Sequence, residues 1–258
     1  MIIDSHAHIN DEAFINDVDK YIKDAEASNV KSFLCVGSNL ETSKQAVEIA
    51  NKYKNVWAAV GVHPSDVKSM GPNDLELIDQ MFSNPKVIAV GEVGLDYYWD
   101  KDKKVQQQQI EYFIKFIELA NKHNVPIIIH SRDAINATYG ILRDHKVKKA
   151  GIIHCYSAGK DYVKRYVELG YYFGIGGTVT FKNAISVKEA VEAIPLDRLL
   201  LETDAPYLAP SPHRGEQNHS KYIPLIINEI AKLKGIDHKT IEDKTTENFE
   251  KLFSVKHS

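Results

Sequence analysis

The chain has 258 residues, of which 43% are hydrophobic and 26% charged, and its formal net charge is −3. This length allows one large domain or two small ones, and about 250 residues suffice for a single (β/α)8 barrel. The balanced charge argues against a nucleic-acid partner, because proteins that bind nucleic acid usually carry an excess of Lys and Arg.

The sequence predicts neither a leader peptide nor a membrane-spanning segment. Its first residues, MIIDSHAHIN, lack a basic stretch followed by a long apolar one, and no run approaches the roughly 18 apolar residues of a spanning helix. Cys35 and Cys155 lie inside apolar runs and have no CxxC partner, which predicts buried reduced thiols. We expect a cytoplasmic protein that has no membrane partner.

Short apolar runs recur along the whole chain and predict strands. They occupy residues 2–3, 32–36, 56–62, 87–90, 125–129, 151–153, 171–175 and 199–201. Most are continuous and β-branched rather than alternating with polar residues. This pattern is typical of strands that are covered on both faces, as in a parallel sheet.

The segments between these runs show helical spacing. The clearest apolar stripe is formed by Ile110, Phe113, Ile114, Ile117, Leu119 and Ala120. Further helices are predicted near residues 18–25, 46–53, 162–169, 184–194 and 223–233. We interpret the glutamine run 106–109 as a solvated helix face.

Strand and helix patterns alternate eight times without a long linker. Such alternation predicts an α/β protein with a parallel sheet. Eight units in this length favour one (β/α)8 TIM barrel over residues 1–258, with the active site at the C-terminal face of the strands. No GxGxxG motif follows the first run, which weakens the alternative of an open, dinucleotide-binding sheet.

Histidines and acids stand at or just past the downstream ends of these runs. His6 and His8 close the first run, where strand alternation points both rings to the same side. One HxH pair is a weak signal, but the strand ends of a barrel converge on the face that carries active sites. A carboxylate after an apolar run is costly to bury unless it is paired or bound to metal. The other candidates are Glu92, His130, His154, Glu202 and Asp204.

The four histidines, together with the carboxylates of Glu92 and Asp204, exceed the ligand set of one zinc ion and suit two divalent ions, with Glu92 as the bridge. Two ions about 3.5–4 Å apart can hold a shared water, lower its pKa and clamp a phosphoryl group. Because such ions supply the positive charge that the composition lacks, the objection from net charge to a phosphodiester substrate loses force.

At these residues the sequence resembles the TatD family of metal-dependent deoxyribonucleases, within the amidohydrolase-like barrels. The matching segments span nearly the whole chain, and their combination is far more specific than a lone HxH. They are DSHAHIN at 4–10, GVHP at 61–64, GEVGLDYY at 91–98, HSRDA at 130–134, HCYS at 154–157, FKNA at 181–184, ETDAPYLAP at 202–210 and PHRG at 212–215.

This resemblance implies a barrel that hydrolyses DNA, as single strands or at ends, with two divalent ions. One ion would be held by His6, His8, Glu92 and Asp204, and the other by Glu92, His130 and His154. Asp204 would also accept the proton of the attacking water, and Glu202 would orient ligands. His63 resembles the substrate-facing histidine of the family, although it could instead be hydrogen-bonded in a turn before Pro64.

One segment departs from the family. Its members often continue RGKRNEP after the loop arginine, whereas here RGEQNHS follows from Arg214, with Glu216 and Gln217 in place of two basic residues. Long DNA is therefore a doubtful substrate. Arg132 and Arg214 remain candidates for phosphate binding, with ion pairing at the barrel rim as the alternative. The lysines at 101, 103 and 104 could meet a DNA backbone, although a solvated helix start explains them better.

Two other functions stay open. The same metal pair could hydrolyse a small cyclic amide or ester, although many relatives with that activity bridge their ions with a modified lysine where this chain has Glu92. A metal-binding scaffold in protein quality control is the third hypothesis, and the ligand count argues against it because structural sites are closed. Ligand softness favours Zn²⁺ or Mn²⁺, whereas the resemblance implies Mg²⁺.

Overall fold

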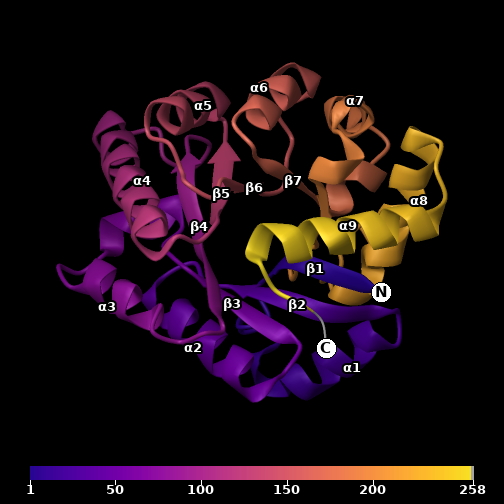
Figure 1. The fold of residues 1–258 in the computed structure, drawn as a ribbon, viewed down its shortest axis with the longest axis horizontal. Coiled ribbons are helices and arrows are strands. Elements are labelled where there is room, and N and C mark those ends of the chain that lie inside the picture. The colour runs from indigo at the N-terminus through magenta and orange to yellow at the C-terminus, as the bar shows by residue number, and fades with distance from the viewer. Residues whose placement is uncertain (257–258) are drawn as a thin grey trace. The chain divides into compact units, whose positions relative to one another are not determined.

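The computed structural model describes residues 1–256 and shows strands and helices alternating along the chain (Figure 1). The strands are β1 (Ile2–Ala7), β2 (Val30–Val36), β3 (Val56–Val60), β4 (Val87–Asp96), β5 (Ile127–Arg132), β6 (Gly151–Ile153), β7 (Tyr172–Ile175) and β8 (Leu199–Leu201). They form one eight-stranded sheet in chain order. Each predicted apolar run is therefore a strand.

The α-helices are α1 (Val18–Glu26), α2 (Leu40–Lys52), α3 (Asp74–Met81), α4 (Lys103–His123), α5 (Ile135–Asp144), α6 (Val163–Glu168), α7 (Ile185–Ala193), α8 (Ile223–Lys234) and α9 (His238–Phe253). Short 3₁₀ helices are η1 (Ile15–Asp17), η2 (Pro64–Ser69), η3 (Lys160–Tyr162), η4 (Gly177–Thr180), η5 (Leu196–Arg198) and η6 (Ser220–Tyr222). No helix in residues 1–256 combines the length and apolar character that crossing a membrane requires.

The chain divides into two compact units. Unit 1 contains residues 1–34 and the chain from 155 onward, and unit 2 contains residues 35–154. In unit 1, a parallel bridge between Ala7 and Ala205 joins β1 to the segment that follows β8. Strands in chain order, with the first beside the end of the last, confirm the (β/α)8 barrel class.

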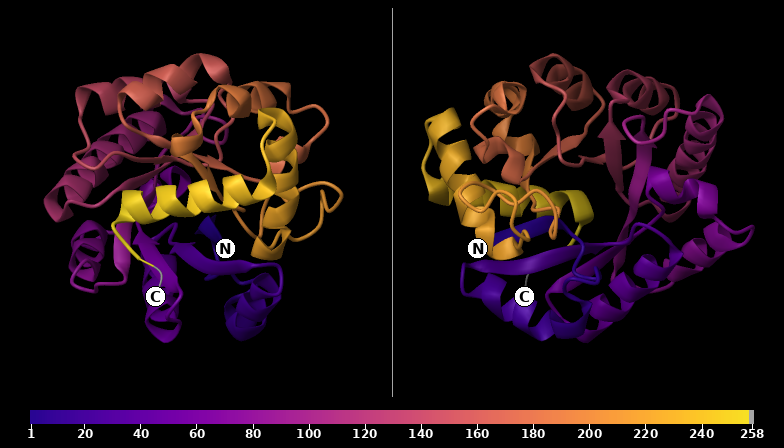
Figure 2. Two further views of the ribbon diagram at one scale, coloured as in Figure 1. Left: turned by 45° about the vertical axis from the view of Figure 1, so that its right-hand side comes forward. Right: turned by 180° about the vertical axis from the view of Figure 1, so that it is seen from behind.

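In unit 1, helix α9 packs on strands β1 and β8 (Figures 1 and 2). The apolar face of α9 includes Ile241, Phe249 and Leu252, at the spacing of one helix side. Asn248 is buried on the same face, and its Nδ2 donates hydrogen bonds to the carbonyl oxygens of Leu196 and Leu199 at 2.8 Å. Strand β8 is thereby anchored directly upstream of Glu202.

In unit 2, strand β4 is longer than its apolar run indicated. All ten of its residues are buried, and its pairing with β5 continues to Asp96 opposite Arg132. Glu92 and His130 therefore lie inside their strands, and the prediction that they end them was wrong. The prediction of a solvated glutamine face was wrong for Gln106 and Gln109, which are buried. Burial of Gln109 is accommodated by hydrogen bonds, including one that its Oε1 accepts from Asp96 N at 3.0 Å.

His219 offers a test of packing in unit 1. Its ring stacks on Tyr21 with centroids 4.1 Å apart, and its Nδ1 accepts a hydrogen bond from Lys221 N. Burial lowers the pKa of His219 to about 4. Because the unfolded chain takes up this proton near pH 6.5 and the folded protein only near 4, the contribution of His219 to the free energy of unfolding should fall by about 3 kcal/mol as the pH is lowered from 6.5 to 4. Urea unfolding at several pH values measures this slope.

His219→Asn keeps an acceptor for Lys221 N but does not titrate, so its slope between pH 6.5 and 4 should differ from that of the wild type by the contribution of His219. The matched control is His238→Asn, because His238 is exposed at the start of α9. An unchanged slope in His219→Asn would show that His219 does not stay neutral in the folded protein.

Candidate metal centre

His6, His8 and Asp204 form a compact group of ligand atoms in unit 1. His6 Nε2 lies 3.3 Å from His8 Nε2, and Asp204 Oδ1 lies 3.7 Å and 3.4 Å from these two atoms. Ligands around a tetrahedral ion with bonds of about 2.0–2.1 Å are about 3.3–3.4 Å apart. These three atoms therefore have the spacing of ligands that share one divalent ion.

A buried carboxylate holds this group together. Asp4 Oδ1 accepts hydrogen bonds from His6 N at 3.2 Å and Thr203 N at 3.1 Å, and its Oδ2 accepts from Thr203 Oγ1 and Ser220 Oγ, both at 2.6 Å. Burial raises the pKa of Asp4 to about 7, against the opposing effect of these hydrogen bonds. Asp4 thus ties β1, which carries His6, to the turn that carries Asp204.

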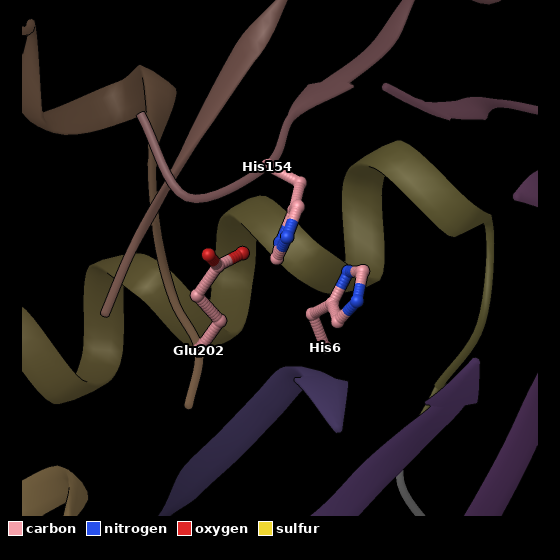
Figure 3. Close-up of side chains that lie close together, drawn as sticks. All are labelled: His6, His154 and Glu202. Carbon is pink, nitrogen blue, oxygen red and sulfur yellow. The ribbon is translucent and has the colours of Figure 1, made fainter. Parts of the chain in front are cut away.

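Glu202 follows β8 directly and is fully buried. His6 and Glu202 each offer one ligand atom within 4.8 Å of the other, and Figure 3 shows both side chains. Glu202 Oε1 accepts a hydrogen bond from Cys155 N at 2.7 Å. A Cβ at Gly174 would lie 1.9 Å from Glu202 Oε2, so any larger residue at this position would displace the carboxylate.

A second group lies in unit 2 around Glu92, which is buried in β4. Glu92 Oε1 lies 2.7 Å from His130 Nδ1 and 3.5 Å from His154 Nε2. His63 Nε2 is 3.9 Å from the same oxygen, and His63, Glu92 and His130 offer ligand atoms that all lie within 4.8 Å of one another. The structure therefore brings the unit 2 candidates together.

His63 is hydrogen-bonded in the turn at Pro64, as one of the two interpretations of its sequence expected. Its Nδ1 accepts a hydrogen bond from Ser65 N at 3.2 Å, so the His63 side chain caps the N-terminus of η2, which begins at Pro64. Its ring also meets that of His130 edge-on, with centroids 4.3 Å apart. The turn thus aims Nε2 at Glu92.

Asp96 is the site residue that the sequence interpretation missed. It is buried at the end of β4, and its Oδ2 lies 3.1 Å from His130 Nε2. Burial disfavours protonation of His130, but its hydrogen bonds to Asp96 and Glu92 outweigh that effect and raise its pKa. A carboxylate that holds one imidazole nitrogen and leaves the other for a metal is the usual outer partner of a histidine ligand. Asp96 lies four residues after Glu92, a same-face spacing that could have revealed it.

The two candidate arginines are exposed and stack on aromatic rings. The guanidinium carbon of Arg132 lies 4.0 Å from the ring centroid of Tyr98, and that of Arg214 lies 4.5 Å from the centroid of Phe181. The lysines at 101, 103 and 104 are exposed where α4 begins, as expected of a solvated helix start. Both cysteines are free thiols; Cys35 is buried and Cys155 partly so.

The donor chemistry fits a metal. Each group combines imidazole nitrogens with carboxylate oxygens, a set that suits Zn²⁺, Mn²⁺ and related divalent ions. Groups of this kind in or just after the strands of a (β/α)8 protein are typical of a metal-dependent hydrolase.

Comparison with known proteins gives the same class, that of metal-dependent hydrolases. The chain belongs to the family described as TatD related DNase, whose profile matches residues 3–254. It is 40% identical to the uncharacterized metal-dependent hydrolase YabD of Bacillus subtilis (strain 168), over 99% of this chain and 100% of that protein. It is 32% identical to a 3'-5' ssDNA/RNA exonuclease TatD of Klebsiella pneumoniae (strain 342), over 98% of each chain.

Solved structures give the same assignment. The crystal structure of the TatD homolog YjjV from Escherichia coli K12 superposes with a TM-score of 0.94 at 28% identity, covering 99% of this chain and 98% of that one. The resemblance seen in the motifs is thereby confirmed, as is the class of metal-dependent hydrolase.

The contact between Asp96 and His130 yields a prediction. Asp96→Asn keeps an oxygen that can accept from Tyr98 N and Trp99 N. It replaces Oδ2, the acceptor for His130 Nε2, with an NH₂ group that cannot accept this hydrogen bond. Loss of such an outer partner should weaken metal binding by about 10–100-fold. Competitive Zn²⁺ titration against a chromophoric chelator measures this change.

Asp133→Asn is the matched control, because Asp133 is an exposed carboxylate in the same unit. Circular dichroism should show both variants folded. Equal Zn²⁺ affinity in Asp96→Asn and the wild type would mean that Asp96 does not position His130 for a metal.

Proposed function

We propose that this protein hydrolyses phosphodiester bonds of DNA, acting on single strands or ends with two divalent ions. The observation that carries the proposal is the pair of histidine–carboxylate groups with ligand spacing in a member of the TatD related DNase family. The Klebsiella pneumoniae relative, named as a single-strand exonuclease, supports the choice of substrate. A single domain over residues 1–258 and a cytoplasmic location belong to the same proposal.

The ligand assignment follows the pattern of the family. One ion would be held by His6, His8, Asp204 and Glu92, and the other by Glu92, His130 and His154. The spacing of ligand atoms within each unit supports it: 3.3–3.7 Å among His6, His8 and Asp204, and 2.7 Å and 3.5 Å from Glu92 to His130 and His154. Zn²⁺, Mn²⁺ and Mg²⁺ are the candidate ions.

The ions, when bound, lower the pKa of water and neutralise charge on the phosphate. Asp204 accepts the proton of the attacking water. The water oxygen then bonds to phosphorus, and the bond from phosphorus to the sugar oxygen breaks. Glu202, held by Cys155 N, keeps the ligands oriented. His63 contacts a phosphate oxygen through Nε2, because its Nδ1 already accepts a hydrogen bond from Ser65 N.

Surface charge limits which DNA this site can favour. The net charge is −3, and Glu216 pairs with His213 at 2.9 Å on the loop where family members often carry basic residues. Long-range attraction of a polyanion is therefore weak, and affinity has to come from contacts close to the metals. Short single strands and DNA ends fit this condition better than long duplexes.

Removing either key carboxylate tests the proposal. Asp204→Asn and Glu92→Gln keep size and polarity but remove the charge needed for metal binding and proton transfer. Each should reduce cleavage of a single-stranded DNA oligonucleotide by at least about a hundredfold, with the fold retained. Gel analysis of end-labelled DNA measures the rate and shows from which end the strand shortens.

Glu168→Gln is the control, because Glu168 is an exposed carboxylate on α6 and should leave the rate unchanged. Cleavage at the wild-type rate by Asp204→Asn and Glu92→Gln would overturn the assignment. Hydrolysis of lactones or hydantoins without cleavage of DNA would favour the small-molecule hydrolase. A wild-type protein that cleaves no phosphodiester with Mg²⁺, Mn²⁺ or Zn²⁺ would favour the scaffold.

Metal removal is a separate prediction. Dialysis against EDTA should abolish DNA cleavage, because the clusters cannot activate water without an ion. Adding back Mn²⁺, Zn²⁺ or Mg²⁺ singly should restore it, and elemental analysis of the protein as purified should find about two ions per chain if both ligand groups are filled. Full activity in EDTA would contradict a metal mechanism.

A further inference from the structure

Two aromatic side chains are unusually exposed at the end of β4. Tyr98 is 44% and Trp99 67% exposed, and their rings meet edge-on with centroids 4.8 Å apart. Large apolar rings in water are costly, and a cluster of them typically marks a binding surface. The metal ligands and catalytic groups assigned above do not include either ring.

A cation completes this surface. The guanidinium carbon of Arg132 lies 4.0 Å from the centroid of the Tyr98 ring and 5.5 Å from that of Trp99. Lys101 Nζ lies 5.6 Å from the Tyr98 centroid. Planar rings beside a stacked guanidinium are the chemistry with which proteins bind unpaired nucleobases, and nearby lysines can meet the phosphates.

Asp96 connects this surface to the candidate metal centre. Its Oδ1 accepts hydrogen bonds from Tyr98 N at 2.9 Å and Trp99 N at 3.0 Å, while its Oδ2 lies 3.1 Å from His130 Nε2. Arg132 stands two residues after His130 in β5, so alternation puts both side chains on the same side of the strand. One buried carboxylate thus sets the loop with the rings relative to a metal ligand.

We propose that Tyr98, Trp99 and Arg132 form a stacking platform for nucleobases of single-stranded nucleic acid, beside His130. The proposal rests on the phosphodiesterase function proposed above and deepens it by assigning a subsite for the base. Stacking needs no excess of basic residues, which explains how a chain with a net charge of −3 binds a polyanion. It also selects unpaired strands, because the faces of paired bases are covered by their neighbours.

The test compares a fluorescein-labelled dT oligonucleotide having phosphorothioate linkages with an abasic strand of the same length and linkages. Fluorescence anisotropy with the metal-loaded protein gives both affinities. Trp99→Ala and Tyr98→Ala should each weaken binding of the dT strand by about five- to a hundredfold, the effect of losing one stacked base. Binding of the abasic strand should be unchanged. Trp99→Phe, which keeps a ring, should bind dT nearly as well as the wild type.

Two controls distinguish general damage to the fold from loss of the proposed base-stacking platform. Leu77→Ala removes an exposed apolar side chain elsewhere in unit 2 and should leave both affinities unchanged. Circular dichroism should show Trp99→Ala and Tyr98→Ala folded like the wild type. Wild-type dT affinity in Trp99→Ala and Tyr98→Ala, or an equal loss for dT and abasic strands, would overturn the platform.

These measurements also separate the two proposals. Cleavage of DNA by a wild-type protein that binds dT and abasic strands equally would leave the phosphodiesterase standing and remove the platform. Binding of dT that depends on the bases and on Trp99, without cleavage of any phosphodiester, would support the platform and refute the phosphodiesterase function.

Discussion

The burial of carboxylates is the constraint on which the rest of this structure depends. Among residues 1–256, Asp4, Glu92, Asp96 and Glu202 are almost completely removed from solvent. Removing a charged carboxylate from water costs on the order of several kcal/mol of folding free energy unless hydrogen bonds or cations compensate its charge. Each of these four acids is met by a specific donor, and the donors are what arrange the site.

The compensation differs from acid to acid, and so does the role that follows. Asp4 is surrounded by hydroxyl and amide donors and has its pKa raised to about 7, which suits a structural tie rather than a ligand. Glu92 is met by imidazoles, which leave its charge to attract a cation. Asp96 divides its two oxygens between loop amides and His130, so it orients rather than binds.

A chain with little net charge can act on an anionic substrate if its attraction is local. Metal ions held by buried carboxylates concentrate positive charge where the phosphate reacts, and stacking surfaces add affinity that does not depend on charge. Glu216 on the loop after Arg214 is compatible with this arrangement, because the loop need not attract a long polyanion. The balanced composition is therefore not an argument against a nucleic-acid substrate.

The sequence by itself determined the alternation of strands and helices, the barrel class and the shared side of His6 and His8, because these follow from local periodicity and residue type. Its motifs also identified the family. The length of β4, the burial of Gln109 and the contact of Asp96 with His130 required the tertiary structure. So did the tie from Asp4 to Thr203, which spans 199 residues, since periodicity within a segment says nothing about which distant donor a buried acid will meet.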